Sequence, residues 1–106
     1  MGESQESHEM TNEQKNAIER LIELAKGDSG GSRRAADFLL AWWNATECGG
    51  FDLTDLWGVS PDVAADMVTV FTLVASTHRY PDTLGYQEDF RRILAAWRPQ
   101  LVSTKS

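Results

Sequence analysis

Apolar side chains recur every three or four residues along most of this chain, and that spacing predicts α-helices. No segment of the sequence alternates apolar and polar residues in the way that a surface strand does. We therefore expect an all-α fold: a compact bundle of four main helices plus one short connecting helical turn. The four helices are predicted over residues 11–26, 32–47, 61–78 and 86–97.

Residues that commonly cap helices stand at the predicted starts. Thr11 and Gln14 have the spacing of a capping box, in which each side chain bonds the backbone of the other. Ser32 and Ser60 are the predicted caps of the second and third helices, and Pro61 suits the first turn of the third.

The apolar stripes predict which side of each helix faces the core. The stripe of the first helix is narrow and consists of Ile18, Leu21, Ile22 and Ala25. The third helix is apolar over much of its circumference, and the positions that we expect in the core are Val63, Ala64, Met67, Val68, Phe71, Val74 and Ala75.

Three of the four tryptophans gather in one stretch of the chain. Trp42 and Trp43 are adjacent, so their side chains point about 100° apart on a helix and reach two neighbours. The helix that carries them is therefore expected at the centre of the domain. Trp57 lies in the connector 51–57, whose apolar residues predict a helical turn that is capped by Asp52 and covers the core.

The two ends of the chain are more polar than the predicted helical domain between them. Residues 1–10 contain no aliphatic residue besides two methionines, so a disordered acidic and polar tail is expected there. Met10 is an equally suitable first residue of the natural protein. Residues 11–102 are expected to form one helical domain with its core in residues 32–102, followed by a polar tail over 103–106.

The chain is acidic: 16 Asp and Glu stand against 10 Lys and Arg, and the net charge is −6. Phosphate backbones repel such a chain, which argues against direct nucleic-acid binding and favours a protein partner with a basic surface. No window approaches the roughly 20 apolar residues of a membrane span. The single cysteine fits a reducing compartment, so we expect a cytoplasmic protein that makes no membrane contact.

Residues suited to catalysis or metal binding are sparse. The sequence lacks a phosphate-binding glycine motif, and His8, Cys48 and His78 do not have the spacing of a zinc site. A nucleophilic Cys48 beside His78 is the enzymatic arrangement to weigh, but the helix dipole disfavours a thiolate at a helix C-terminus. We therefore expect no catalytic residue, no cofactor and no metal.

Acidic residues around the connector are the first candidates for a protein-binding surface. They are Asp52, Asp55, Asp62 and Asp66, with Trp57 among them. The competing interpretation is structural, because acids are common as helix caps and first-turn charges and a tryptophan in a connector commonly packs in the core.

The segment that follows the third helix is the second candidate. His78, Arg79 and Tyr80 bring a titratable ring, a cation and an aromatic ring together, and Tyr and Arg are enriched in interaction hot spots. Internal packing of the same three side chains is the competing interpretation.

Three stretches of the sequence carry a resemblance to a known family. They are RRAADFLLAWWNATECGGFDLTDLWGV over 33–59, YPDTLGYQEDF over 80–90 and AAWRPQLV over 95–102. Together they resemble a family of small uncharacterised proteins carried on plasmids and integrative elements of proteobacteria. That family has no assigned activity, so the resemblance implies only a context, the cargo of a mobile element in a bacterial cytoplasm.

Three functions stay open. The favoured one is a non-enzymatic protein–protein interaction protein, whose specific version is an anti-CRISPR or anti-restriction inhibitor of a host defence system. The second is a plasmid-maintenance or transcriptional accessory factor that contacts DNA through Arg91, Arg92 and Arg98. The third is an enzyme that uses Cys48 and His78. A homo-oligomer is also compatible with the surplus of apolar side chains.

Overall fold

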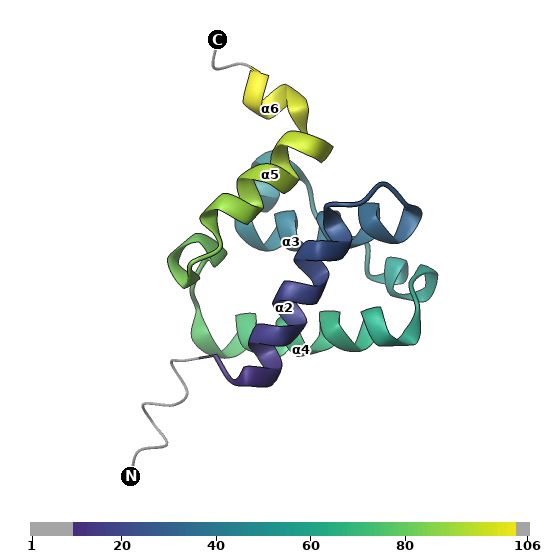
Figure 1. Cartoon of the computed structure of the whole chain (residues 1–106), viewed down its shortest axis with the longest axis vertical. Helices are drawn as coiled ribbons and strands as arrows, with labels where there is room; N and C mark the ends of the chain where they lie inside the picture. Colours follow the sequence, from purple (N-terminus) through teal and green to yellow (C-terminus); the bar gives the residue numbers. More distant parts are fainter. Residues whose placement is uncertain (1–9, 104–106) are drawn as a thin grey trace.

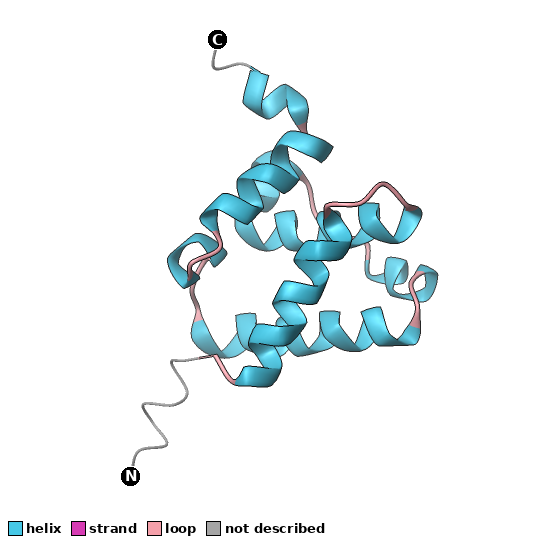
Figure 2. Ribbon diagram, viewed as in Figure 1, coloured by secondary structure: helices cyan, strands magenta, loops and turns pink. Residues whose placement is uncertain are grey.

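The computed structural model describes residues 10–103, and every regular element in that range is a helix (Figures 1 and 2). The all-α prediction is therefore confirmed. Residues 1–9 of the tail expected over 1–10, and the last residues, 104–106, lie outside the described residues. Met10 is partly buried against the core, so the expectation of a tail is wrong for this residue. The main helices are α2 (Asn12–Ala25), α3 (Gly30–Cys48), α4 (Pro61–Thr77) and α5 (Gln87–Trp97). Shorter ones are η1 (Leu53–Gly58), η2 (Pro81–Leu84) and α6 (Pro99–Ser103).

The predicted caps are correct at two helices and wrong at one. Thr11 and Gln14 form the capping box of α2, with N···O distances of 3.0 and 3.1 Å, and Ser60 accepts a bond from the backbone N–H of Val63. The α3 helix begins earlier than predicted, because Ser29 rather than Ser32 caps it. Ser32 instead lies buried in the first turn of the helix.

The core forms where α2 crosses α3 and α4, as Figure 1 shows. The narrow stripe of α2 is completely buried, as predicted, and Ala17 joins it. The expectation of a core confined to residues 32–102 is therefore wrong. Other helices contribute most of the remaining buried apolar side chains: Ala35, Ala36, Leu39, Leu40, Met67, Val70, Leu73, Phe90 and Ile93.

The predicted core face of α4 is also wrong in part. Met67 is buried, but Val70 and Leu73 share the core with it, whereas Val68 and Phe71 are 56% and 62% exposed. The reason is that α4 is apolar on several sides, so periodicity alone does not select the side on which α2 packs.

The tryptophan pair lies near the centre of the fold, as expected. Both rings are half-buried and contact Phe90 of α5 edge-on, with ring centroids 6.1 Å from Trp42 and 5.7 Å from Trp43. The connector behaves differently from the prediction. Asp52 caps η1, but no residue of η1 is buried, so this helix does not seal the core.

The C-terminal segment is tied to the start of the domain. The indole N–H of Trp97 donates to the carbonyl of Ala25 at 2.7 Å, and the Arg98 guanidinium bonds the Asp37 carboxylate and the Cys48 carbonyl at 2.8 and 2.9 Å. Beyond Arg98 the chain turns into α6, which the sequence did not indicate. Among the described helices, none is both long enough and apolar enough to cross a membrane.

Candidate functional site

An apolar groove runs between α3, η1 and α4. It consists of two adjoining hollows of about 240 and 250 Å³ that share four lining side chains, and only apolar residues line either of them. We call it the apolar groove and define it by Phe38, Phe51, Leu53, Leu56, Val68 and Phe71. The groove exists because α2 holds α3 and α4 from one side, while nothing in the described chain fills the space between them on the other.

Two contacts position η1 beside the groove. The ring of Phe51, just before η1, meets the Phe38 ring of α3 edge-to-face with centroids 5.2 Å apart. At the other end, the Arg34 guanidinium lies 3.5 Å from the Asp55 carboxylate and close against Gly58, where a Cβ would stand 2.7 Å from its Cζ. A glycine at this position lets the guanidinium approach the backbone of η1.

The hydroxyl groups of α4 form hydrogen bonds with backbone carbonyls of α4 itself rather than with another element. Thr69, Thr72 and Ser76 each bond a carbonyl one turn back, at 3.0 Å in every case. Hydroxyl groups bonded in this way have little hydrogen-bonding capacity left for another molecule. The large apolar side chains on the exposed side of α4 are Val68 and Phe71.

The segment that supplies the groove-lining side chains carries only acidic charges, while Arg34 reaches η1 from outside that segment. Residues 35–78, which supply all of the lining side chains of the groove, contain six acids and no lysine or arginine. Three of these acids are paired with arginines from elsewhere in the chain: Asp37, Asp55 and Asp66. Glu47, Asp52 and Asp62 form no ion pair within residues 10–103.

The structure does not bring the four candidate aspartates into one patch. Asp66 makes a two-pronged ion pair with Arg20 of α2, at 2.8 and 2.9 Å, and this bond raises the pKa of the guanidinium. Asp62 lies on the same side and lines the same shallow hollow as Asp66. Asp66 thus joins α2 to α4 and is not a free acid.

The two aspartates of η1 have local roles. Asp52 accepts bonds from the backbone N–H and the hydroxyl of Thr54, which lower the pKa of its carboxyl. Asp55 belongs to the Arg34 contact described above. Trp57 is 83% exposed, so of the candidates near the connector it is the one with a large free apolar surface.

The segment after α4 is partly committed to internal bonds. His78 adopts a left-handed conformation with φ 56°, and its ring bonds the Ala75 carbonyl at 3.1 Å. The guanidinium of Arg79 donates to the carbonyl of Thr83 at 2.7 Å. Tyr80 is 61% exposed, so it is the residue of this group that remains open to a ligand.

The residues of the alternative functions are separated or engaged. Cys48 is buried at the end of α3, where desolvation raises the pKa of its thiol, and no hydrogen bond joins it to His78 in the described part of the chain. Residues 10–103 hold no cluster of three or more potential metal ligands. Arg98 is engaged by Asp37, which leaves Arg91 and Arg92 as the exposed cations of α5.

Sequence reasoning missed most of the groove. Val68 and Phe71 were expected inside the core, and Phe38 and Leu53 were not singled out as a surface. One signal for this site is present in the sequence: α4 carries more apolar residues than a single buried face uses.

Comparison with known proteins identifies a family for this chain but assigns no activity to it. No curated protein and no solved structure matches the chain. A family of unknown function, DUF7673, matches residues 15–98, a span that runs from α2 through Arg98 and includes the whole apolar groove. The chain belongs to the DUF7673 family of unknown function.

Proposed function

We propose that this protein is a non-enzymatic interaction protein that binds an amphipathic helical segment of another protein in the apolar groove. The observation that carries the proposal is the exposure of Val68 and Phe71 beside two hollows with wholly apolar linings. Helical segments commonly bind in this way, with an apolar face laid into a groove between helices.

Burial of the exposed groove residues supplies the driving force. Leu53 is 68% exposed, and Val68 and Phe71 are more than half exposed. Complete burial of a side chain of this size contributes about 1.5–3 kcal/mol. Three such side chains at the centre of an interface are comparable with the small set of residues that dominates many natural complexes.

Charge narrows the chemistry of the partner. Because the groove-forming segment 35–78 has acids and no lysine or arginine, a helix with basic residues beside its apolar face is the favoured occupant. Among these acids, Asp52 stands at the start of η1 beside the groove and has no ion pair in the described chain, so it is available to such a helix. A neutral or acidic helix would lack this attraction.

A specific version of the proposal follows from the resemblance of the sequence. If the protein is cargo of a bacterial mobile element in the cytoplasm, a natural partner is a basic, nucleic-acid-binding component of a host defence system. The net charge of −6 supports a basic partner surface in general. DNA contact through α5 is the less favoured function, because Arg98 is engaged internally.

The test compares three forms of the full chain as bait in a nuclease-treated bacterial lysate. Phe71→Glu places a charge in the groove, and Asn16→Glu adds the same charge at an exposed position of α2. We expect a stoichiometric partner with the wild type and with Asn16→Glu, and its loss with Phe71→Glu. The segment of the partner that cross-links to the groove should be helical and basic, and should bind as a synthetic peptide.

Two results would overturn the proposal. Retention of the partner by Phe71→Glu would place binding outside the groove. A wild-type dimer that Phe71→Glu dissociates, measured by analytical ultracentrifugation, would show that a second copy of the chain occupies it. Circular dichroism of both variants separates these outcomes from a loss of folding.

A further inference from the structure

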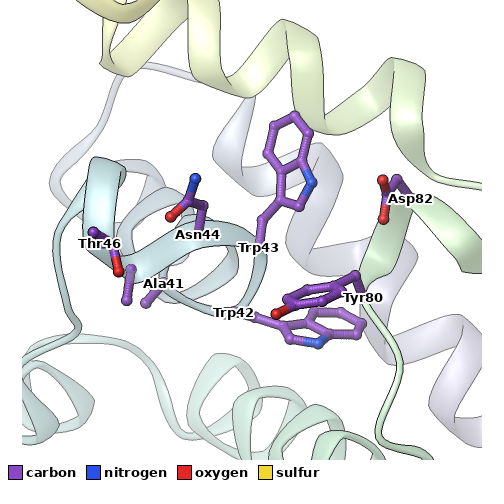
Figure 3. Close-up of a pocket in the computed structure, with 8 residues that line it drawn as sticks. Ala41, Trp42, Trp43, Asn44, Thr46, Tyr80 and Asp82 are labelled. Carbon is purple, nitrogen blue, oxygen red and sulfur yellow. The ribbon is translucent and has the colours of Figure 1, made fainter.

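Another hollow, of about 480 Å³, lies where the last turns of α3 face η2. Trp42, Trp43 and Tyr80 line it together with Asp82, and Figure 3 shows their rings and the carboxylate around one space. We call it the aromatic hollow and define it by these four residues. It adjoins the apolar groove, since Trp42 borders both, but its chemistry differs.

The backbone of α3 departs from the helix at this place. Asn44 has φ −163° and ψ 82°, values far from those of an α-helix, and its side chain lines the hollow. The side-chain oxygen of Asn44 accepts a bond from the backbone N–H of Glu47, which begins the final turn of α3 again. The interruption separates that turn from the two tryptophans and leaves room beside them.

The two indole rings of the hollow are held in place before any ligand arrives. The indole N–H of Trp42 donates to the Arg79 carbonyl at 3.0 Å, and both indoles contact Phe90 edge-to-face. Rings fixed in this way lose little freedom on binding. Tyr80 is 61% exposed and borders the mouth of the hollow.

Among residues 10–103, Asp82 is the only charged residue that lines the hollow, and no cation of this range pairs with it. Its Oδ1 atom is covered from solvent and has no hydrogen-bond partner, and Asp82 forms no ion pair within residues 10–103. Because Oδ1 is covered, a cation in the hollow acts on this carboxylate through its charge and through the other oxygen, and the carboxylate gains from it because burial has removed part of its hydration.

We propose that the aromatic hollow binds an organic cation, an alkylammonium or guanidinium group, between the aromatic rings and the carboxylate of Asp82. Aromatic faces attract such cations, and a carboxylate beside the rings adds charge and accepts an N–H bond. The source of the cation is either a free amine or a lysine or arginine side chain of a bound polypeptide. This site stands independently of the helix proposed for the apolar groove.

The first test titrates the ¹⁵N-labelled full chain with n-butylammonium and follows the four tryptophan indole signals by NMR. We expect saturable shifts for Trp42 and Trp43 and none for Trp57 and Trp97, which do not line the hollow. 1-Pentanol, a neutral molecule of similar length, should not reproduce them. Equal shifts of all four indoles, or shifts that never saturate, would overturn the proposal.

Two variants assign the interaction to the named groups. Asp82→Asn keeps the shape of the side chain and removes its charge, and should weaken butylammonium binding about tenfold. Tyr80→Ala removes an exposed ring and should weaken it about threefold. Asp62→Asn, which removes the same charge elsewhere, is the matched control. Unchanged affinity in both Asp82→Asn and Tyr80→Ala would contradict the site.

A comparison of probes identifies the source of the cation. An acetylated and amidated Gly-Lys-Gly peptide carries the same cation on a backbone, and Gly-Arg-Gly carries the guanidinium. Tighter binding of either peptide than of butylammonium assigns the hollow to a side chain of a partner. Equal or weaker binding of both assigns it to a free amine.

Discussion

Helices α2 and α4 lie against each other, yet they differ in how far their apolar residues are buried. Every member of the α2 stripe is at most 3% exposed, whereas Val68 and Phe71 of α4 are more than half exposed. The α2 helix is strongly one-sided, and α4 is apolar on several sides. The apolar face of α2 is buried completely in the core, whereas α4 keeps part of its apolar surface exposed to solvent.

The same contrast extends to polar groups around the two helices. On the α2 side, charged groups are joined across elements, as in Arg20–Asp66 and Lys26–Asp89 at 2.8 and 3.0 Å. Beside the apolar groove, Asp52 at the start of η1 makes no ion pair in the described chain. Because the two sets of residues differ in this way, substitutions can test the residues that stabilise the fold separately from the residues that are open to a partner.

The largest effect is expected for Leu21→Ala in α2. Leu21 is 1% exposed, and its truncation removes buried apolar surface and leaves a cavity, which together cost about 3 kcal/mol of unfolding free energy. Urea denaturation followed by circular dichroism measures the loss. A loss below about 1 kcal/mol would mean that α2 is not the centre of the core.

Asp37→Asn should have the next largest effect, because it weakens the bond that holds Arg98. The side chains of Asp37 and Arg98 are 15% and 20% exposed, so the charged hydrogen bond is partly shielded from water and contributes about 2 kcal/mol. Arg33→Gln is the matched control, since the exposed Arg33–Asp37 pair should contribute less than about 1 kcal/mol. Similar losses of unfolding free energy in Asp37→Asn and Arg33→Gln would mean that the bond between Asp37 and Arg98 contributes no more than the exposed Arg33–Asp37 pair.

Tyr86 should give the protein a pH dependence at alkaline values. Burial, together with the charge and hydrogen bond of Glu19, raises the pKa of its phenol from 10.0 to about 12. The folded state therefore favours the neutral phenol, and this stabilisation is complete below pH 10 and is lost as the pH rises through about 12. Unfolding curves between these pH values should show the decline in the wild type and a smaller decline in Tyr86→Phe.

The smallest effect on stability is expected for Phe71→Ser, which sharpens the contrast with Leu21. Phe71 is 62% exposed, so its replacement should change the unfolding free energy by less than about 0.5 kcal/mol. Binding of an apolar dye such as anilinonaphthalene sulfonate should fall, because the groove loses its largest exposed side chain. A loss of stability comparable with that of Leu21→Ala would show that the α4 face is part of the core.

The sequence predicted the helices and much of the core because the relevant signals are local. The Thr11–Gln14 capping box and the stripe of α2 depend on residues three or four positions apart, and both are confirmed. The start of α3 was misplaced because Ser29 and Ser32 are both suitable caps, three residues apart. Local pattern cannot choose between two such serines.

The candidate sites depended on information that the local pattern lacks. The groove needs η1 to stand beside α4, and that placement rests on Arg34 reaching Asp55 and Gly58, more than twenty residues away. The aromatic hollow needs Asn44 to leave the helical path and η2 to face it. Tyr80 was singled out from its type alone, while Asp82 was not, because its missing counter-ion is visible only in three dimensions.

The bonds of Trp97 and Arg98 also bear on the order of folding. They join residues that are 72 and 61 positions apart, whereas α2 and α3 are neighbours in the chain and pack on each other directly. Contacts between neighbouring helices form with a small loss of chain entropy, and distant ones form late. We therefore expect that a nascent chain which still lacks residues 97 and 98 cannot make these closing bonds, so that the domain is completed only after its last stretch has been synthesised.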